Sequence, residues 1–162
     1  MPISRFDETA DANKIRGPIL SLDLGAKRVG AAVSDPSLIA IRRLKTLRRS
    51  NWKQLLRDVD DLIRQLDVKT LVIGFPLKLD GSEGSAATQT RQIARKFARS
   101  LDLPVYLQDE RLTSREAEET LRASGFRSEE LAVRIDSESA AIILRDFIAS
   151  RQQTTRVLRQ LD

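Results

Sequence analysis

Short apolar runs along the chain predict five β-strands. The runs span residues 19–24, 29–34, 38–46, 71–75 and 105–108. The first three are separated by only a few residues, which is typical of an antiparallel meander. The fourth run is apolar throughout, and this suits a parallel strand that is covered on both faces.

Apolar positions at helical spacing predict four helices. The clearest begins at Trp52 and ends near Leu66, and Asn51 with Gln54 resembles a capping box at its start. The other helices are expected at residues 93–101, 113–125 and 136–149. An antiparallel meander that continues into parallel strands through helical crossovers predicts an α/β fold, with a mixed sheet of five strands, the first three antiparallel, and helices on both faces.

The chain of 162 residues is expected to form one domain. Residues 1–16 are polar and lack periodicity, so they predict a disordered N-terminal tail before a domain at residues 17–150. Residues 151–162 are expected to be a C-terminal extension. No apolar run approaches the ~18 residues of a membrane span, and residues 1–16 lack the apolar stretch of a signal peptide. A cytoplasmic location without a membrane partner is therefore expected.

The composition excludes several kinds of chemistry. There is no His and no Cys, so neither the usual zinc ligands nor an imidazole-activated nucleophile is available. Any metal must be a hard cation held by oxygen atoms. The net charge is +5 and Arg outnumbers Lys. This balance suits a phosphate-bearing partner, although many basic domains bind nothing acidic.

Three acidic residues have positions that suit a metal site. Asp23 lies in an apolar strand, where a carboxylate is costly to bury unless it is paired or metal-bound. Glu110 follows the last predicted strand, and Asp136 begins the last predicted helix. Below Asp136, the small Ala140 would let that helix approach the strand that carries Asp23. Each acid also has an ordinary interpretation, as a turn former, as a surface ion pair with Arg111, or as an N-cap.

Basic residues near these acids are candidates for phosphate contacts. They are Lys27, Arg28, Lys78, Arg111 and Arg115. Residues 42–49 hold further Lys and Arg side chains, which either follow a nucleic-acid backbone or protect a sheet edge from aggregation. Three other acids, Asp35, Asp109 and Glu138, are expected to lie outside the metal site.

Four sequence blocks resemble the signature of the YqgF/RuvX family. They are LDLGAKRVGAAVSD at 22–35, GFPL with DGSEG at 74–84, DERLT at 109–113, and ID with AA at 135–141. The resemblance implies a ribonuclease H-like fold and a nuclease related to Holliday junction resolvases, associated in bacteria with maturation of the 5′ end of pre-16S ribosomal RNA. It also implies that Asp23, Glu110 and Asp136 are the three acidic site residues.

The chemistry of such a site agrees with this resemblance. Phosphodiester cleavage by two divalent ions needs a rigid cluster of carboxylates, and Mg²⁺ or Mn²⁺ accepts such oxygen ligands. The expected partner is nucleic acid, either structured RNA or branched DNA, and a ribosomal precursor particle is a further candidate. The oligomeric state stays open.

Two other function classes compete with a nuclease. A phosphotransferase of the actin-like type would clamp a nucleotide between two such domains, and the chain is long enough for only one. A non-catalytic RNA-binding module gains nothing from carboxylates that face phosphates. Within the nuclease class, the sequence does not decide between precursor ribosomal RNA and a four-way DNA junction.

Overall fold

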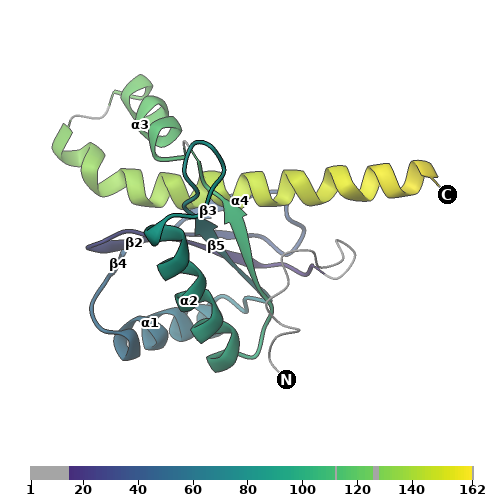
Figure 1. The fold of residues 1–162 in the computed structure, drawn as a ribbon, viewed down its shortest axis with the longest axis horizontal. Coiled ribbons are helices and arrows are strands. Elements are labelled where there is room, and N and C mark those ends of the chain that lie inside the picture. The colour runs from purple at the N-terminus through teal and green to yellow at the C-terminus, as the bar shows by residue number, and fades with distance from the viewer. Residues whose placement is uncertain (1–14, 112, 126–127, 162) are drawn as a thin grey trace.

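The structure is a computed structural model that describes residues 15–111, 113–125 and 128–161, without the side chains of 113–115, 118, 128–133 and 152–161. Its described part contains one sheet of six strands (Figure 1). The strands are β1 (Ile19–Leu24), β2 (Arg28–Ser34), β3 (Ile41–Arg43), β4 (Leu47–Arg48), β5 (Thr70–Phe75) and β6 (Val105–Asp109).

The strand order confirms the predicted mixed sheet. It runs β3-β2-β1-β5-β6, and β4 also pairs with β2. The strands β1, β2 and β3 are antiparallel, whereas β1 with β5 and β5 with β6 are parallel. The carboxyl ends of β1, β5 and β6 therefore meet at one edge of the sheet.

The third predicted strand, residues 38–46, is wrong in its bounds. Asp35 accepts hydrogen bonds from the backbone N atoms of Ile39 and Ala40, so the chain is still turning where the strand was expected to begin. Pairing with β2 starts at Ile41 and is interrupted after Arg43. It resumes at β4, and the sheet therefore has six strands instead of five.

The described residues contain four helices; the first, second and fourth cover the sheet, and the third packs against the fourth. The helices are α1 (Trp52–Gln65), α2 (Ser85–Ser100), α3 (Thr113–Ala123) and α4 (Ser128–Leu161). Asn51 caps α1 by accepting from the backbone N of Gln54, as predicted, but the Gln54 side chain donates to Asp58 instead of completing a capping box.

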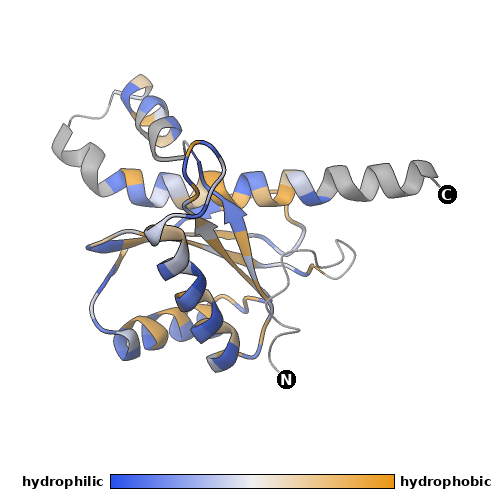
Figure 2. Cartoon of the chain, viewed as in Figure 1, coloured by the Kyte–Doolittle hydropathy of each residue, from blue (hydrophilic) through white to orange (hydrophobic). Residues whose placement is uncertain are grey.

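The helices lie on both faces of the sheet, as predicted. Figure 1 shows α1 and α2 on one side and α4 on the other. Leu55 of α1 and Phe97 of α2 belong to the core cluster that includes Leu22 of β1. Ile143 and Phe147 of α4 pack in a second cluster on the opposite face. Figure 2 shows hydrophobic residues along the strands between these layers.

Helix α4 is much longer than the predicted helix at residues 136–149. No Gly or Pro occurs between Ser128 and Leu161, so nothing in the sequence ends the helix within this range. Asp136 consequently lies inside α4 and is not its N-cap. The predicted extension at 151–162 continues the same helix as far as Leu161.

The predicted N-terminal tail falls mostly outside the described residues, because residues 1–14 are not described. Its last two residues lie against the domain. Ile15 packs on the α4 side of the core, and the carbonyl oxygen of Arg16 accepts a 2.7 Å hydrogen bond from Thr70. No helix among the described residues is long and apolar enough to cross a membrane.

Candidate active site

Asp23 and Glu110 come together although their strands are not neighbours. Asp23 lies near the carboxyl end of β1, Glu110 follows β6, and β5 separates the two strands. Their carboxyl groups are nevertheless hydrogen-bonded to each other. The residue of β5 at this level is Gly74, and a Cβ atom there would lie 2.5 Å from Oε2 of Glu110. Gly74 thus leaves the space through which Glu110 reaches Asp23.

The third acid arrives from α4, where the helix touches the sheet. Asp23 pairs with Gly30 in the antiparallel register of β1 and β2. A Cβ atom on Gly30 would lie 1.8 Å from the backbone oxygen of Asp136, so the helix backbone rests directly on this glycine. Ser21 of β1 also donates a 2.7 Å hydrogen bond to the carbonyl oxygen of Ala140. The approach expected from Ala140 is present, and Gly30 is what permits it beside Asp136.

The environment of the two strand carboxyls favours their neutral forms. Burial raises the pKa of Glu110 to about 9, assisted by the negative charge of Asp23 and by the hydrogen bond between them. Burial also raises the pKa of Asp23, and the charge of Asp136 adds to this. The pair therefore keeps a shared proton to a higher pH than two separate carboxyl groups would. Two buried acids that share a proton form a place where a cation would relieve their repulsion.

The donor set fits a hard cation. All three side chains offer only oxygen atoms, which Mg²⁺ and Mn²⁺ prefer. Among the described residues, no three acidic side chains are gathered closely enough to hold one ion together. Asp136 instead accepts a 2.7 Å hydrogen bond from Nε of Arg28. Asp136 therefore lies beside the Asp23–Glu110 pair with its carboxylate held by Arg28.

The predicted phosphate contacts fall in different environments. Lys27 is exposed in the turn between β1 and β2, and Lys78 is exposed in the loop after β5. Arg28 is engaged by Asp136. Arg111 donates from Nε to Asp109 at 2.8 Å and lies against the loop that carries Lys78. The side chain of Arg115 lies outside the described part of the chain.

The residues that sequence reasoning missed are mainly glycines and small polar residues. Gly30 and Gly74 set the contacts of Asp136 and Glu110, and Ser21 fixes α4 to the sheet. A glycine inside a strand often marks the close approach of another group, so this signal was available in the sequence. Glu138, expected to lie outside the site, is buried and paired with Arg43 at the edge of the sheet.

The chain is similar to one family of known proteins over most of its length. Residues 17–150 match the RuvX family, described as Holliday junction resolvase. A protein named "Putative pre-16S rRNA nuclease" from Anaeromyxobacter sp. (strain Fw109-5) is 42% identical over 132 residues, which are 82% of this chain and 96% of that protein. A protein of the same name from Koribacter versatilis (strain Ellin345) is 36% identical, covering 87% of this chain and 92% of its own.

Two solved structures share the fold at low sequence identity. T. thermophilus RuvC in complex with Holliday junction substrate has a TM-score of 0.53 at 13% identity, covering 84% of this chain and 96% of its own. Fowlpox virus resolvase with Holliday junction DNA has a TM-score of 0.51 at 14% identity, covering 82% and 97%. The match of most of the chain to one family, on this ribonuclease H-like fold, shows that the chain belongs to the YqgF/RuvX family.

Proposed function

We propose that this chain is a divalent-metal-dependent nuclease that matures the 5′ end of pre-16S ribosomal RNA. The observation that carries the proposal is the meeting of Asp23 and Glu110 at the carboxyl edge of the sheet, with Asp136 brought beside them over Gly30. The names of the relatives support ribosomal RNA as the substrate.

Asp23, Glu110 and Asp136 would hold Mg²⁺ or Mn²⁺. Such ions, when bound, activate a water molecule and stabilise charge on the leaving oxygen. The protein contributes rigidity, because β1 and β6 fix two of the carboxyls and the contact at Gly30 fixes the backbone of the third. Arg28 holds the Asp136 carboxylate, and Lys27 offers an exposed positive charge to a phosphate beside the site.

A Holliday junction resolvase is the second candidate function. The description of the family and the two junction-bound structures favour it. A resolvase would need two such sites in a dimer. Measuring the mass of the protein in solution and its cleavage of a four-way DNA junction therefore distinguishes the two candidate functions. We further infer a cytoplasmic location and action on a ribosomal precursor particle, which accord with precursor ribosomal RNA as substrate.

The test compares cleavage by the unmodified protein and by Asp23→Asn, Glu110→Gln and Asp136→Asn. Each change removes a metal ligand with little change of shape, so cleavage of a labelled RNA carrying the precursor 5′ extension should fall by roughly 100-fold or more. Asp61→Asn on the exposed side of α1 is the matched control and should cleave normally.

Chelation should abolish cleavage, and Mg²⁺ or Mn²⁺ should restore it. Normal cleavage by any of the three variants would contradict the proposal, as would activity that survives chelation. Hydrolysis of ATP by the pure protein would favour the phosphotransferase alternative instead.

A further inference from the structure

We infer that the groove between residues 43–46, α3 and α4 binds a backbone phosphate of the nucleic acid beyond the cleaved bond. The inference rests on the proposed function, because the groove lining includes Ser137 and Glu138, which directly follow Asp136 in α4. The ligand chemistry is a phosphodiester backbone, which either RNA or a DNA junction supplies.

The groove is a cavity of about 630 Å³ on the α4 side of the sheet. Its charged and hydroxyl-bearing lining residues include Arg43, Lys45, Thr46, Thr120, Ser124 and Arg134. They come from three separate parts of the chain, the connection from β3 to β4 and the helices α3 and α4. The groove is therefore a product of the tertiary fold and not of a single loop.

Two contacts hold the wall formed by residues 43–46 in place. Ser137 of α4 donates a 3.0 Å hydrogen bond to the carbonyl oxygen of Leu44. The Arg43 guanidinium donates two hydrogen bonds to the Glu138 carboxylate. One runs from Nε to Oε2, and the other runs from Nη2 to Oε1 at 3.0 Å. The Glu138 side chain is 7% exposed and that of Arg43 is 56% exposed, so the carboxylate is buried beneath the guanidinium.

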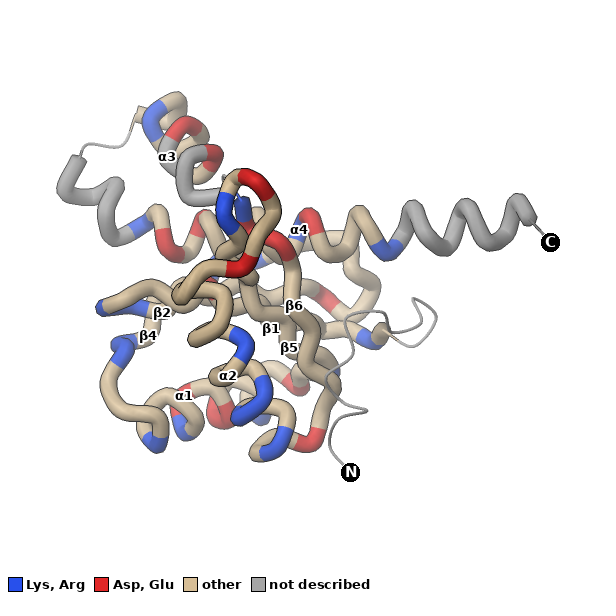
Figure 3. Tube along the Cα trace, viewed as in Figure 1, with Lys and Arg blue, Asp and Glu red and all other residues tan. Residues whose placement is uncertain are grey.

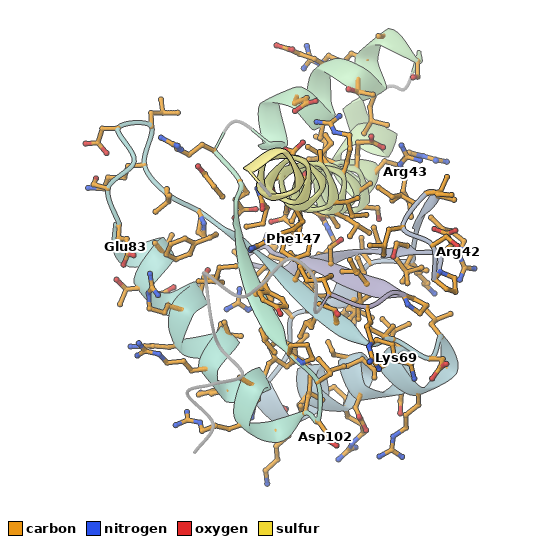
Figure 4. All side chains as sticks on the ribbon, turned by 90° about the vertical axis from the view of Figure 1, so that its right-hand side faces the viewer. Arg42, Arg43, Lys69, Glu83, Asp102 and Phe147 are labelled. Atoms are coloured by element: carbon orange, nitrogen blue, oxygen red, sulfur yellow. The ribbon has the colours of Figure 1, made fainter. Side chains whose placement is uncertain are left out.

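Figure 4 labels Arg42 and Arg43 at the edge of the sheet and shows Arg43 as the nearer of the two to α4. Neighbouring residues of a strand face opposite sides, so only one of the two can turn to this groove. Arg43 lines it, whereas Arg42 lines a smaller cavity together with Val33 and Leu66.

The charge of the groove suits an anion. Three cationic side chains line it, together with the Glu138 carboxylate that Arg43 already engages. Lys45 and Arg134 are the other two cations of the lining. The hydroxyls of Thr46 and Thr120 in the same lining can donate hydrogen bonds to phosphate oxygens, whereas Ser124 and Ser137 already donate theirs to backbone carbonyl oxygens.

A basic path connects the groove to the candidate active site. Arg48 of β4 lies opposite Arg28 of β2, and Arg28 binds Asp136. Like charges placed directly opposite are unfavourable in a sheet unless another group offsets them. Lys45 precedes Arg48 by three residues, so their Cα atoms lie within about 11 Å of each other. Figure 3 shows Lys and Arg at this end of β2 and β4.

The test is a salt titration of binding, made with chelator present so that nothing is cleaved. The variant Lys45→Ala with Arg134→Ala should bind a labelled single-stranded RNA roughly tenfold more weakly. The slope of log affinity against log salt should become less steep by about 0.7 for each lost phosphate contact. Arg95→Ala with Arg99→Ala on α2 removes the same charge from the other face and should leave the slope unchanged.

A second measurement separates this inference from the proposed function. The groove variant should cleave RNA at the normal rate when RNA is saturating, with a raised KM. If the proposed function is wrong, neither the variant nor the unmodified protein will cleave RNA. Lys45→Arg alone should bind normally, which excludes misfolding at this position. Repetition with a four-way DNA junction identifies which backbone the groove holds.

Equal weakening by the groove pair and the α2 pair would overturn the inference, because it would reflect long-range attraction by a basic protein. Unchanged binding of both RNA and the DNA junction by the groove pair would also overturn it.

Discussion

Arg28 donates from its Nε atom to Oδ2 of Asp136 across 2.7 Å, linking the start of β2 to the interior of α4. From the sequence, Arg28 is expected to bind phosphate and Asp136 to bind metal. In the structure the two side chains bind each other. The guanidinium therefore offsets the charge of the third carboxylate and orients it, so Arg28 is a positioning residue for Asp136.

This pairing predicts different outcomes for two neighbouring basic residues. Arg28→Ala should lower the cleavage rate at saturating substrate by roughly 10- to 100-fold, because Asp136 loses the partner that orients it. Lys27→Ala should leave that rate unchanged, weaken binding and reduce the salt slope by about 0.7. Steady-state kinetics and salt titrations of both variants check this. A pure KM effect from Arg28→Ala would show that the ion pair has no part in cleavage.

Gly30→Ala should destabilise the protein and inactivate it. The added Cβ would lie 1.8 Å from the Asp136 backbone oxygen, and a helix backbone cannot move aside as a side chain can. The free energy of unfolding should fall by at least ~2 kcal/mol, measured by urea unfolding, and cleavage should fall with it. Gly84→Ala meets the flexible end of Lys78 instead, and its stability should change little.

Gly74→Ala should disturb the site more than the fold. Its Cβ would lie 2.5 Å from Oε2 of Glu110 and from Cδ1 of Ile143, both at the ends of side chains that can rotate. We expect cleavage to be lost because Glu110 no longer reaches Asp23, with a smaller loss of stability than for Gly30→Ala. Stability and cleavage measured on both variants test this order, and the reverse order would contradict it.

The stability of the metal-free protein should decline as pH rises. The pKa of Glu110 is about 9 in the folded protein, above its ordinary value of 4.5. The folded state therefore binds this proton more tightly than the unfolded state. The stabilisation is complete below pH 4.5 and is lost as pH rises to about 9.

Urea unfolding across this pH range, with chelator present, measures the decline. Glu110→Gln removes the titrating group, so its stability should depend less on pH than that of the unmodified protein. Identical pH profiles for the two proteins would show that Glu110 does not hold a shifted proton.

The parts of the fold that depend on local pattern could be predicted from the sequence. The apolar run of β1 and the spacing of Leu55 and Val59 in α1 identify their elements directly, because periodicity reflects which face is buried. The break between β3 and β4 could not be predicted. It accompanies contacts of Arg43 and Leu44 with α4, about ninety residues away in sequence.

The contacts within the candidate site could not be predicted from the sequence. Asp23 and Glu110 follow from the positions of their strands, whereas the bond of Arg28 to Asp136 joins residues that are 108 positions apart. The start of α4 was misplaced because Asp136 has the character of an N-cap while the helix begins at Ser128. Residue type alone does not reveal which of two acceptable starting points a helix uses.

The contact of α4 with Gly30 has a consequence for how such a chain can diverge. Main-chain atoms, and not the volumes of core side chains, fix the separation of the helix and the sheet beside Asp136, and the bond from Ser21 to Ala140 fixes it again one turn further along. Apolar residues deeper in this layer, such as Leu144 and Phe147, are therefore expected to exchange for others without moving the Asp136 carboxylate. The position of Asp136 beside the sheet should therefore be kept while the core residues of this layer change during evolution.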